Sequence, residues 1–217
     1  MRRSRFVIAI SLSLICGVTI AGAVAFLTAR TETKSNVFTV GEVSIELKEP
    51  QWSAQPDNNK NGIPDKAENL SPSEAVDKDP KVTNVGINDA YIYLRVRVPK
   101  ETVDYVDENG NVVKKGKIEL FSYEINSGWS EFLKDSTNEC TDYYYYYDNV
   151  VTPTDTTLEL FNTITFADVI EGQLEDKNYT VDITAYGVQV TEDTDAISAW
   201  NQLAAEKHLL KYEGEMT

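Results

Sequence analysis

Cysteine and histidine are almost absent from this sequence, which has 217 residues, two cysteines and one histidine. Cys16 lies in an apolar N-terminal run, so the rest of the chain has one thiol, Cys140, and cannot form an intramolecular disulfide. The single histidine, His208, leaves no HExxH pair for a zinc protease and no support for a serine triad. P-loop, GxGxxG and GxSxG motifs are also missing. We therefore expect no catalytic residues, no organic cofactor and no enzymatic activity.

Basic residues are also scarce, since 20 Lys and Arg stand against 35 Asp and Glu, for a net charge of −15. A surface this acidic repels phosphate backbones, so we expect no nucleic-acid partner. It also disfavours docking on anionic lipid, while it favours solubility and attracts cations. The length fits a single domain.

Residues 1–25 have the three parts of a secretory signal peptide. Three arginines within residues 2–5 form the basic start, residues 6–25 are uncharged and mostly apolar, and residues 23–25 (Ala-Val-Ala) give a small-x-small cleavage pattern. We expect a signal peptidase to cleave after Ala25 and to release residues 26–217 with no stable membrane anchor. The alternative is an uncleaved anchor, because an apolar run of this length can span a bilayer.

Alternation of apolar and polar side chains predicts a mostly β domain over residues 26–217. The pattern is clearest at residues 90–99, and the pair Asn109-Gly110 predicts a hairpin turn farther on. In residues 90–99, Ile92, Leu94, Val96 and Val98 alternate with Tyr91, Tyr93, Arg95 and Arg97. Further strands are expected at residues 43–47, 117–125, 142–147, 156–161, 163–167 and 178–190. Seven or more short strands predict a jelly-roll-like β-sandwich.

The C-terminal part of the chain predicts one short helix, over residues 194–211. Thr194 is the expected N-cap, and acidic residues stand close to the first turn. Ile197, Trp200 and Leu203 follow at helical spacing and form an apolar stripe. We expect this helix to pack on the edge of the sandwich.

A loop insertion at residues 50–80 contains a calcium-loop motif of the EF-hand type at residues 57–68, which read Asp-Asn-Asn-Lys-Asn-Gly-Ile-Pro-Asp-Lys-Ala-Glu. Gly62 stands where such a loop turns sharply. Calcium is a hard cation that takes six to eight oxygen ligands. The oxygen donors predicted from the spacing are Asp57, Asn59, Asn61, the Ile63 carbonyl, Asp65 and Glu68.

Three carboxylates and two amides predict a weak calcium site of the extracellular class, roughly micromolar to millimolar. Pro64 and the lack of a preceding amphipathic helix distinguish the motif from a regulatory EF-hand. We expect the ion to order the 50–80 segment. The alternative is a solvated loop rich in Asn and Asp that holds no metal.

Residues 143–147 are five consecutive tyrosines. One interpretation is an edge or surface strand with a wet side. The other is a contact stripe for a sugar or for a neighbouring subunit, since tyrosine suits interfaces that have one wet end.

Four segments together resemble one known family. They are residues 21–28 (Ala-Gly-Ala-Val-Ala-Phe-Leu-Thr), residues 36–45 (Asn-Val-Phe-Thr-Val-Gly-Glu-Val-Ser-Ile), residues 79–86 (Asp-Pro-Lys-Val-Thr-Asn-Val-Gly) with residues 88–91 (Asn-Asp-Ala-Tyr), and residues 184–189 (Thr-Ala-Tyr-Gly-Val-Gln) leading to Ala199-Trp200. Their order and spacing are similar to those of the TasA/camelysin family, secreted biofilm-matrix proteins of Gram-positive bacteria with SipW-dependent signal peptides.

The resemblance implies a jelly-roll sandwich, export and assembly into extracellular fibres. In such fibres an N-terminal segment, here residues 26–40, completes the sheet of the next subunit. We therefore expect a structural protein of the extracellular matrix or cell surface that associates with itself or related subunits and binds Ca²⁺ in one loop. The alternatives are a monomeric extracellular binding module, for example for carbohydrate, and a camelysin-like metalloprotease, for which the sequence names no site.

Overall fold

The structure is a computed structural model that describes residues 38–40, 43–68, 70–170, 172–174 and 177–214. The expected leader, residues 1–25, lies outside the described residues, as does most of the 26–40 segment. Within the described ranges, no helix is both long enough and apolar enough to cross a membrane.

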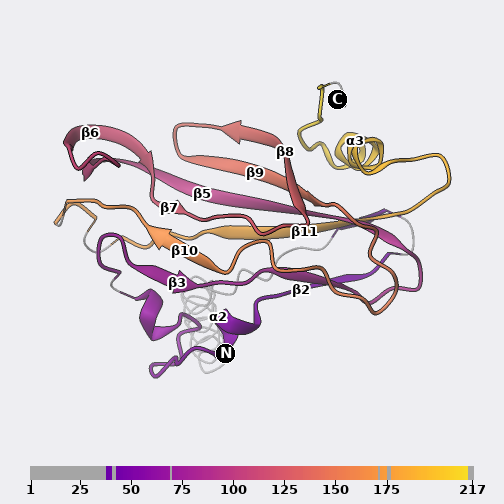
Figure 1. Cartoon of the computed structure of the whole chain (residues 1–217), viewed down its shortest axis with the longest axis horizontal. Coiled ribbons are helices and arrows are strands. Elements are labelled where there is room, and N and C mark those ends of the chain that lie inside the picture. The colour runs from indigo at the N-terminus through magenta and orange to yellow at the C-terminus, as the bar shows by residue number, and fades with distance from the viewer. Residues whose placement is uncertain (1–37, 41–42, 69, 171, 175–176, 215–217) are drawn as a thin grey trace, which may run out of the picture.

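The largest sheet has six strands and is built around one long strand. The strands are β1 (Phe38–Val40), β11 (Asp182–Gln189), β5 (Ala90–Val106), β9 (Cys140–Tyr147) and β8 (Trp129–Ser136), in that order, with β6 (Val112–Glu119) paired to the far end of β5. All neighbours are antiparallel except β1, which runs parallel to β11. Because β5 is 17 residues long, it extends past β9 and forms a projecting arm with β6 (Figure 1).

Two smaller sheets cover one face of this large sheet. One contains β3 (Ala75–Asp77), β10 (Thr163–Phe166) and β7 (Phe121–Ser122), and the other pairs β2 (Ile45–Lys48) with β4 (Lys81–Asn84). Their apolar side chains form one core with those of β5, β9 and β11, including Ile45, Val76, Val82, Ile92, Leu94, Val96, Tyr145 and Ile183. The chain is therefore mostly β and sandwich-like, as the alternation predicts.

Gly187 of β11 brings two layers of the sandwich into close contact. A Cβ atom at this position would lie 3.0 Å from Val43 Cγ1 and 3.0 Å from Ile45 Cγ2. These distances are shorter than ordinary carbon–carbon contacts, so a side chain here would force the layers apart. Glycine at this point therefore allows the 43–48 segment to pack directly on the sheet.

The two faces of β5 confirm the expected alternation. Ile92, Leu94 and Val96 are fully buried in the core, while Tyr93 and Arg95 point to the opposite face. The Asn109-Gly110 turn is also confirmed. Gly110 has φ 79°, and its amide donates to the Asp107 carbonyl at 2.9 Å.

The C-terminal helix α3 (Ala196–Lys207) covers the outer face of the large sheet and does not lie on its edge, contrary to our expectation (Figure 1). Its Trp200 side chain is fully buried. The indole lies 5.2–5.4 Å, centroid to centroid, from the rings of Tyr93, Phe132, Tyr144 and Tyr186. Aromatic packing on a sheet face thus forms a second, smaller core.

The helix is also shorter than the expected span of 194–211, and its N-cap is Asp195 in place of Thr194. The Asp195 carboxylate accepts the Ser198 amide at 2.8 Å, which satisfies one of the free N–H groups of the first turn. At the other end His208 takes the left-handed conformation, with φ 56°, and ends the helix.

Several strand predictions need correction. Residues 156–161 form no strand and contribute one isolated bridge, between Thr156 and Thr83. The expected strand at 117–125 is divided between the end of β6 and the two-residue β7, and the one at 178–190 starts only at Asp182. Strands β3, β4 and β8 were not predicted.

Candidate calcium-binding loop

The loop at residues 57–68 folds around its own polar side chains. The two carboxylate oxygens of Asp57 accept the amides of Asn61 at 3.2 Å and Gly62 at 2.9 Å. The Asn61 side-chain oxygen accepts the Ile63 amide at 2.8 Å. Lys60 and Gly62 both have positive φ, 58° and 85°, which turns the chain back on itself. The sharp turn expected at Gly62 is therefore present.

Three of the residues predicted to bind calcium, Asn59, Asn61 and Glu68, contact one another. The side-chain nitrogen of Asn59 lies 2.9 and 3.1 Å from the two oxygens of Glu68, and the Asn61 side-chain nitrogen also donates to Glu68. Each amide offers an oxygen as well as a nitrogen, and a rotation of the amide group exchanges them. The N–H dipoles of two neutral amides thus point at the Glu68 carboxylate, at a place where a bound cation would be its electrostatic partner.

Asp65 does not join this group. Its carboxylate accepts the Asn58 amide at 2.9 Å and also the Asn58 side chain. The Ile63 carbonyl has no hydrogen-bond donor among the described residues, so its oxygen is free for a ligand. Of the predicted ligands, the structure thus brings Asn59, Asn61 and Glu68 together, while Asp57 binds the Asn61 and Gly62 amides and Asp65 binds Asn58.

No group of three or more His, Cys, Asp or Glu side chains in the described part of the chain is arranged to hold a metal. The loop has three carboxylates, of which Asp65 accepts hydrogen bonds from Asn58, Asp57 from backbone amides and Glu68 from two side-chain amides. A calcium site here would therefore depend on amide and carbonyl oxygens, which is typical of weak sites.

Protein contacts hold the chain on both sides of the loop. The Lys78 amine lies 2.8 and 2.9 Å from the two Glu49 carboxylate oxygens and 4.4 Å from the centroid of the Trp52 ring. Asp79, which is buried, accepts the amide of Gln51 at 2.8 Å in the short helix α2 (Pro50–Ala54). Protein contacts thus hold the described residues on both sides of the loop, and the prediction that calcium orders this segment is narrowed to residues 57–68.

The tyrosine run is an interior strand, which corrects the interpretation as an edge or surface strand. Strand β9 has β5 on one side and β8 on the other. Tyr144 and Tyr145 are buried on opposite faces, and desolvation raises the pKa of Tyr144 to about 12. The Tyr145 hydroxyl lies 3.0 Å from the Tyr123 hydroxyl inside the sandwich. The run therefore builds two cores and is not available as a continuous contact stripe for sugar.

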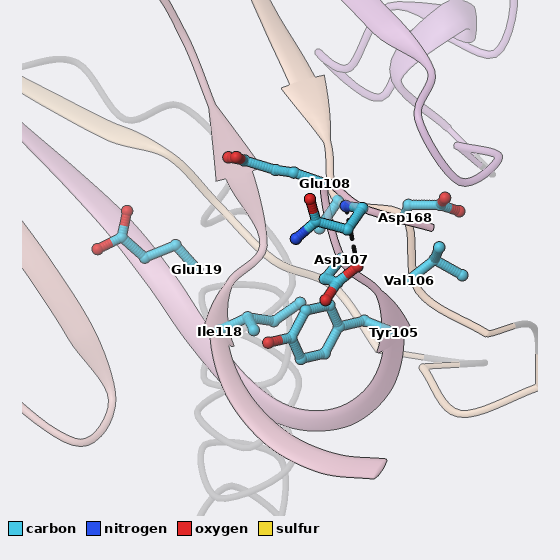
Figure 2. Close-up of a pocket in the computed structure, with 9 residues that line it drawn as sticks. Tyr105, Val106, Asp107, Glu108, Ile118, Glu119 and Asp168 are labelled. Carbon is cyan, nitrogen blue, oxygen red and sulfur yellow. Dashed lines mark hydrogen bonds between the residues drawn. The ribbon is translucent and has the colours of Figure 1, made fainter. Parts of the chain in front are cut away.

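A shallow open pocket of about 410 Å³ lies beside the β5–β6 hairpin (Figure 2). Tyr105 and Ile118 form its apolar side, and Asp107, Glu119 and Asp168 are among the acidic residues around it. Hydrogen bonds from the Asn111 and Asn109 amides hold the Asp107 carboxylate within its own turn and lower its pKa. Glu119 accepts hydrogen bonds from Thr141 and Tyr143. Two of the carboxylates thus have structural roles, and the pocket gives no argument for catalysis.

No protein-family model, no curated protein and no solved structure matches this chain. The TasA/camelysin resemblance consequently stays a prediction from the sequence motifs. The sequence did not indicate the contact between Lys78 and Glu49. These residues stand 29 positions apart and become partners only because the fold brings the end of β3 next to the start of α2.

Proposed function

We propose that this protein is a secreted structural protein of the extracellular matrix or cell surface, which assembles with further copies of itself or related subunits and binds calcium at residues 57–68. The leader-like residues 1–25 and the family-like segments motivate the proposal. The structural observation that carries it is the pairing of β1 at the edge of the large sheet.

Strand β1 has only three residues and pairs in parallel with Tyr186, Gly187 and Val188 of β11. Short parallel pairing is among the weaker forms of strand association. The backbone N–H and C=O groups on this side of β11 pair with an extended segment, which here is β1.

The segment expected to be freed by cleavage, residues 26–40, ends in β1. Exchange of this segment between copies would leave the pairing of Phe38–Val40 unchanged and transfer it to the next subunit. This arrangement supports a matrix or fibre component, because each copy both receives and donates an edge strand. The metalloprotease alternative has no observation in its favour, and burial of Tyr144 and Tyr145 weakens the sugar-binding alternative.

The test is negative-stain electron microscopy of residues 26–217, which contain every described element. Samples are incubated with calcium and with chelator. We expect filaments of regular width, and a change in their number or order with calcium would link the loop to assembly. Dispersed particles under all conditions, including after seeding with cell-surface material, would contradict the matrix function.

Strand exchange has its own test in a chain with Cys140→Ser, Val40→Cys and Val188→Cys, since positions 40 and 188 are register partners. A chain that pairs β1 within itself gives an oxidised monomer on a non-reducing gel. A chain that exchanges β1 gives a ladder of covalent oligomers, which is the result expected from assembled samples. A monomer alone in filament-containing samples would show that filaments form without exchange.

A further inference from the structure

The end of the sandwich where β5 begins is strongly acidic. The Ala90 amide donates to the Val151 carbonyl at 3.0 Å, and the Val190 amide donates to the Asp89 carbonyl at 2.9 Å. These bonds bring together the loops 85–89, 148–155 and 189–195, which we call the acidic end (Figure 1). The three loops contain no Lys or Arg, and their acids are Asp89, Asp148, Asp155, Glu192, Asp193 and Asp195.

The acidic end also exposes apolar side chains. Ile87 is 76% exposed, the highest value among the large apolar side chains described as exposed, and Val85 and Val150 are 51% and 40% exposed. Val85 and Ile87 stand on the 85–89 loop, and Val150 stands on the 148–155 loop beside it. Apolar groups among charged ones are the usual composition of a protein-binding surface.

The arm at the other end of β5 carries a basic face. Val112 pairs with Val106 and Lys117 pairs with Thr102. Positions 102 and 106 share a face of β5, and Val112 and Lys114 share a face of β6, because side chains alternate along a strand. Val112, Lys114 and Lys117 therefore point the same way, and we call them the basic face. All three are exposed, Val112 by 57%. Asp104 stands between positions 102 and 106 on the same side, and its carboxylate accepts the Lys115 amide.

A β-bulge between β5 and β6 affects the direction in which these side chains point. The register of β5 and β6 shifts between Val103 and Tyr105, opposite Lys115. Lys115 has φ 51°, which is uncommon for a residue with a side chain, and its amide is held at 2.8 Å by an Asp104 carboxylate oxygen. Bulges of this kind re-aim the side chains that follow them.

We propose that the acidic end of one copy docks on the basic face of a second copy. This inference rests on the proposed assembly function and names the two surfaces that meet. The charges are complementary, and each surface contributes exposed apolar side chains for the centre of the contact. Because the two surfaces differ and lie at opposite ends of β5, the contact is heterologous and repeats in one direction, which gives an open chain of subunits.

The lysines of β6 have a simpler possible role, since charged side chains protect free strand edges from unwanted pairing. Charge reversal distinguishes the two roles. A glutamate protects an edge as well as a lysine does, but it repels the acidic end.

The experiment compares assembly of residues 26–217 with that of two double variants, by sedimentation velocity and negative-stain microscopy. One variant carries Lys114→Glu with Lys117→Glu, and the other carries Asp89→Lys with Glu192→Lys. We expect each alone to need about tenfold more protein for the same degree of assembly, as the loss of a few exposed charge pairs implies. An equimolar mixture should recover assembly, because each variant then meets a surface of opposite charge.

The matched control for the lysine variant is Lys48→Glu with Lys211→Glu, which changes the net charge by the same amount and sign at exposed positions outside both surfaces. Circular dichroism verifies that all variants are folded. Unchanged assembly of the double variants, or failure of the mixture to recover it, would overturn the docking surfaces while the proposed function stands. Failure of the unsubstituted chain to assemble at all would instead refute the proposed function and this inference together.

Discussion

The ion pair between Lys78 and Glu49 allows a quantitative test of how the chain on both sides of the 57–68 loop is anchored. The Lys78 side chain is 9% exposed and the Glu49 side chain 20% exposed, in contrast to most ion pairs of this chain. The amine contacts both carboxylate oxygens and lies over the Trp52 ring. We therefore consider three variants, Glu49→Ala, Lys78→Met and the double variant.

The expected magnitudes follow from burial. Removing one partner of a fully buried pair costs about 3–5 kcal/mol, and some water access at Glu49 lowers our expectation for Glu49→Ala to about 2–3 kcal/mol. Lys78→Met keeps the volume but loses the pair and a cation–π contact worth about 1 kcal/mol, so we expect about 1–2 kcal/mol. The double variant leaves no unpaired charge, and its cost should fall below the sum of the single costs by about 1 kcal/mol or more.

Urea unfolding, followed by tryptophan fluorescence, measures these changes as shifts of the midpoint at constant slope. The matched control is the exposed pair of Lys48 and Glu46, whose nitrogen–oxygen distance of 2.9 Å is similar but whose side chains are 46% and 54% exposed. Its removal should cost no more than about 0.5 kcal/mol. If Glu49→Ala is no more costly than Glu46→Ala, burial does not strengthen the pair and the reasoning fails.

Three further predictions concern the loop, the layer contact and pH. Calorimetry on residues 26–217 should detect one calcium site, and Asp57→Ala with Glu68→Ala should remove it; unchanged heat in that variant would show that the loop is not the ligand. Gly187→Ala should destabilise the fold by about 1–3 kcal/mol in urea unfolding, because its Cβ enters the two 3.0 Å contacts described above; a neutral effect would mean that the layers adjust freely. A hydrogen bond from Lys81 holds the pKa of Glu159 below its ordinary value of 4.5, so the pair stabilises the fold above that pH and loses its effect as pH falls through the folded-state pKa. Lys81→Met should therefore reduce the loss of stability measured between about pH 5 and pH 3, and an unchanged loss would refute this linkage.

The strands that the sequence predicts well are those whose pattern is local. The ten residues from Ala90 to Pro99 alternate because one face is buried in the sandwich core, while the other carries tyrosines that pack with α3 and arginines that bind polar side chains. Strand β8 was missed because a register shift between Glu131 and Leu133 breaks its alternation. Residues 156–161 alternate, but beside β4 they form only the isolated bridge of Thr156 with Thr83 and separate backbone hydrogen bonds at Thr157 and Leu160, not a strand ladder.

The candidate site divides in the same way. Spacing alone identified Asp57, Asn59, Asn61 and Glu68, and three of them meet in the structure, because a short loop with a tight turn brings near neighbours together. Spacing could not show that the Asp65 carboxylate accepts hydrogen bonds from Asn58. That contact depends on the turn at Pro64 and on the short 3-10 helix Asp65–Ala67 after it.

The sequence by itself determined the β character, the turn at Asn109-Gly110 and the position of the calcium motif, because each depends on residues within about a dozen positions of one another. Only the tertiary structure decided that the tyrosines of β9 lie inside the sheet and that α3 covers its face. It alone brought Lys78 to Glu49, and three acidic loops to one end of β5. These features join segments far apart in the chain, and their position depends on strand order and layer packing, which no local pattern encodes.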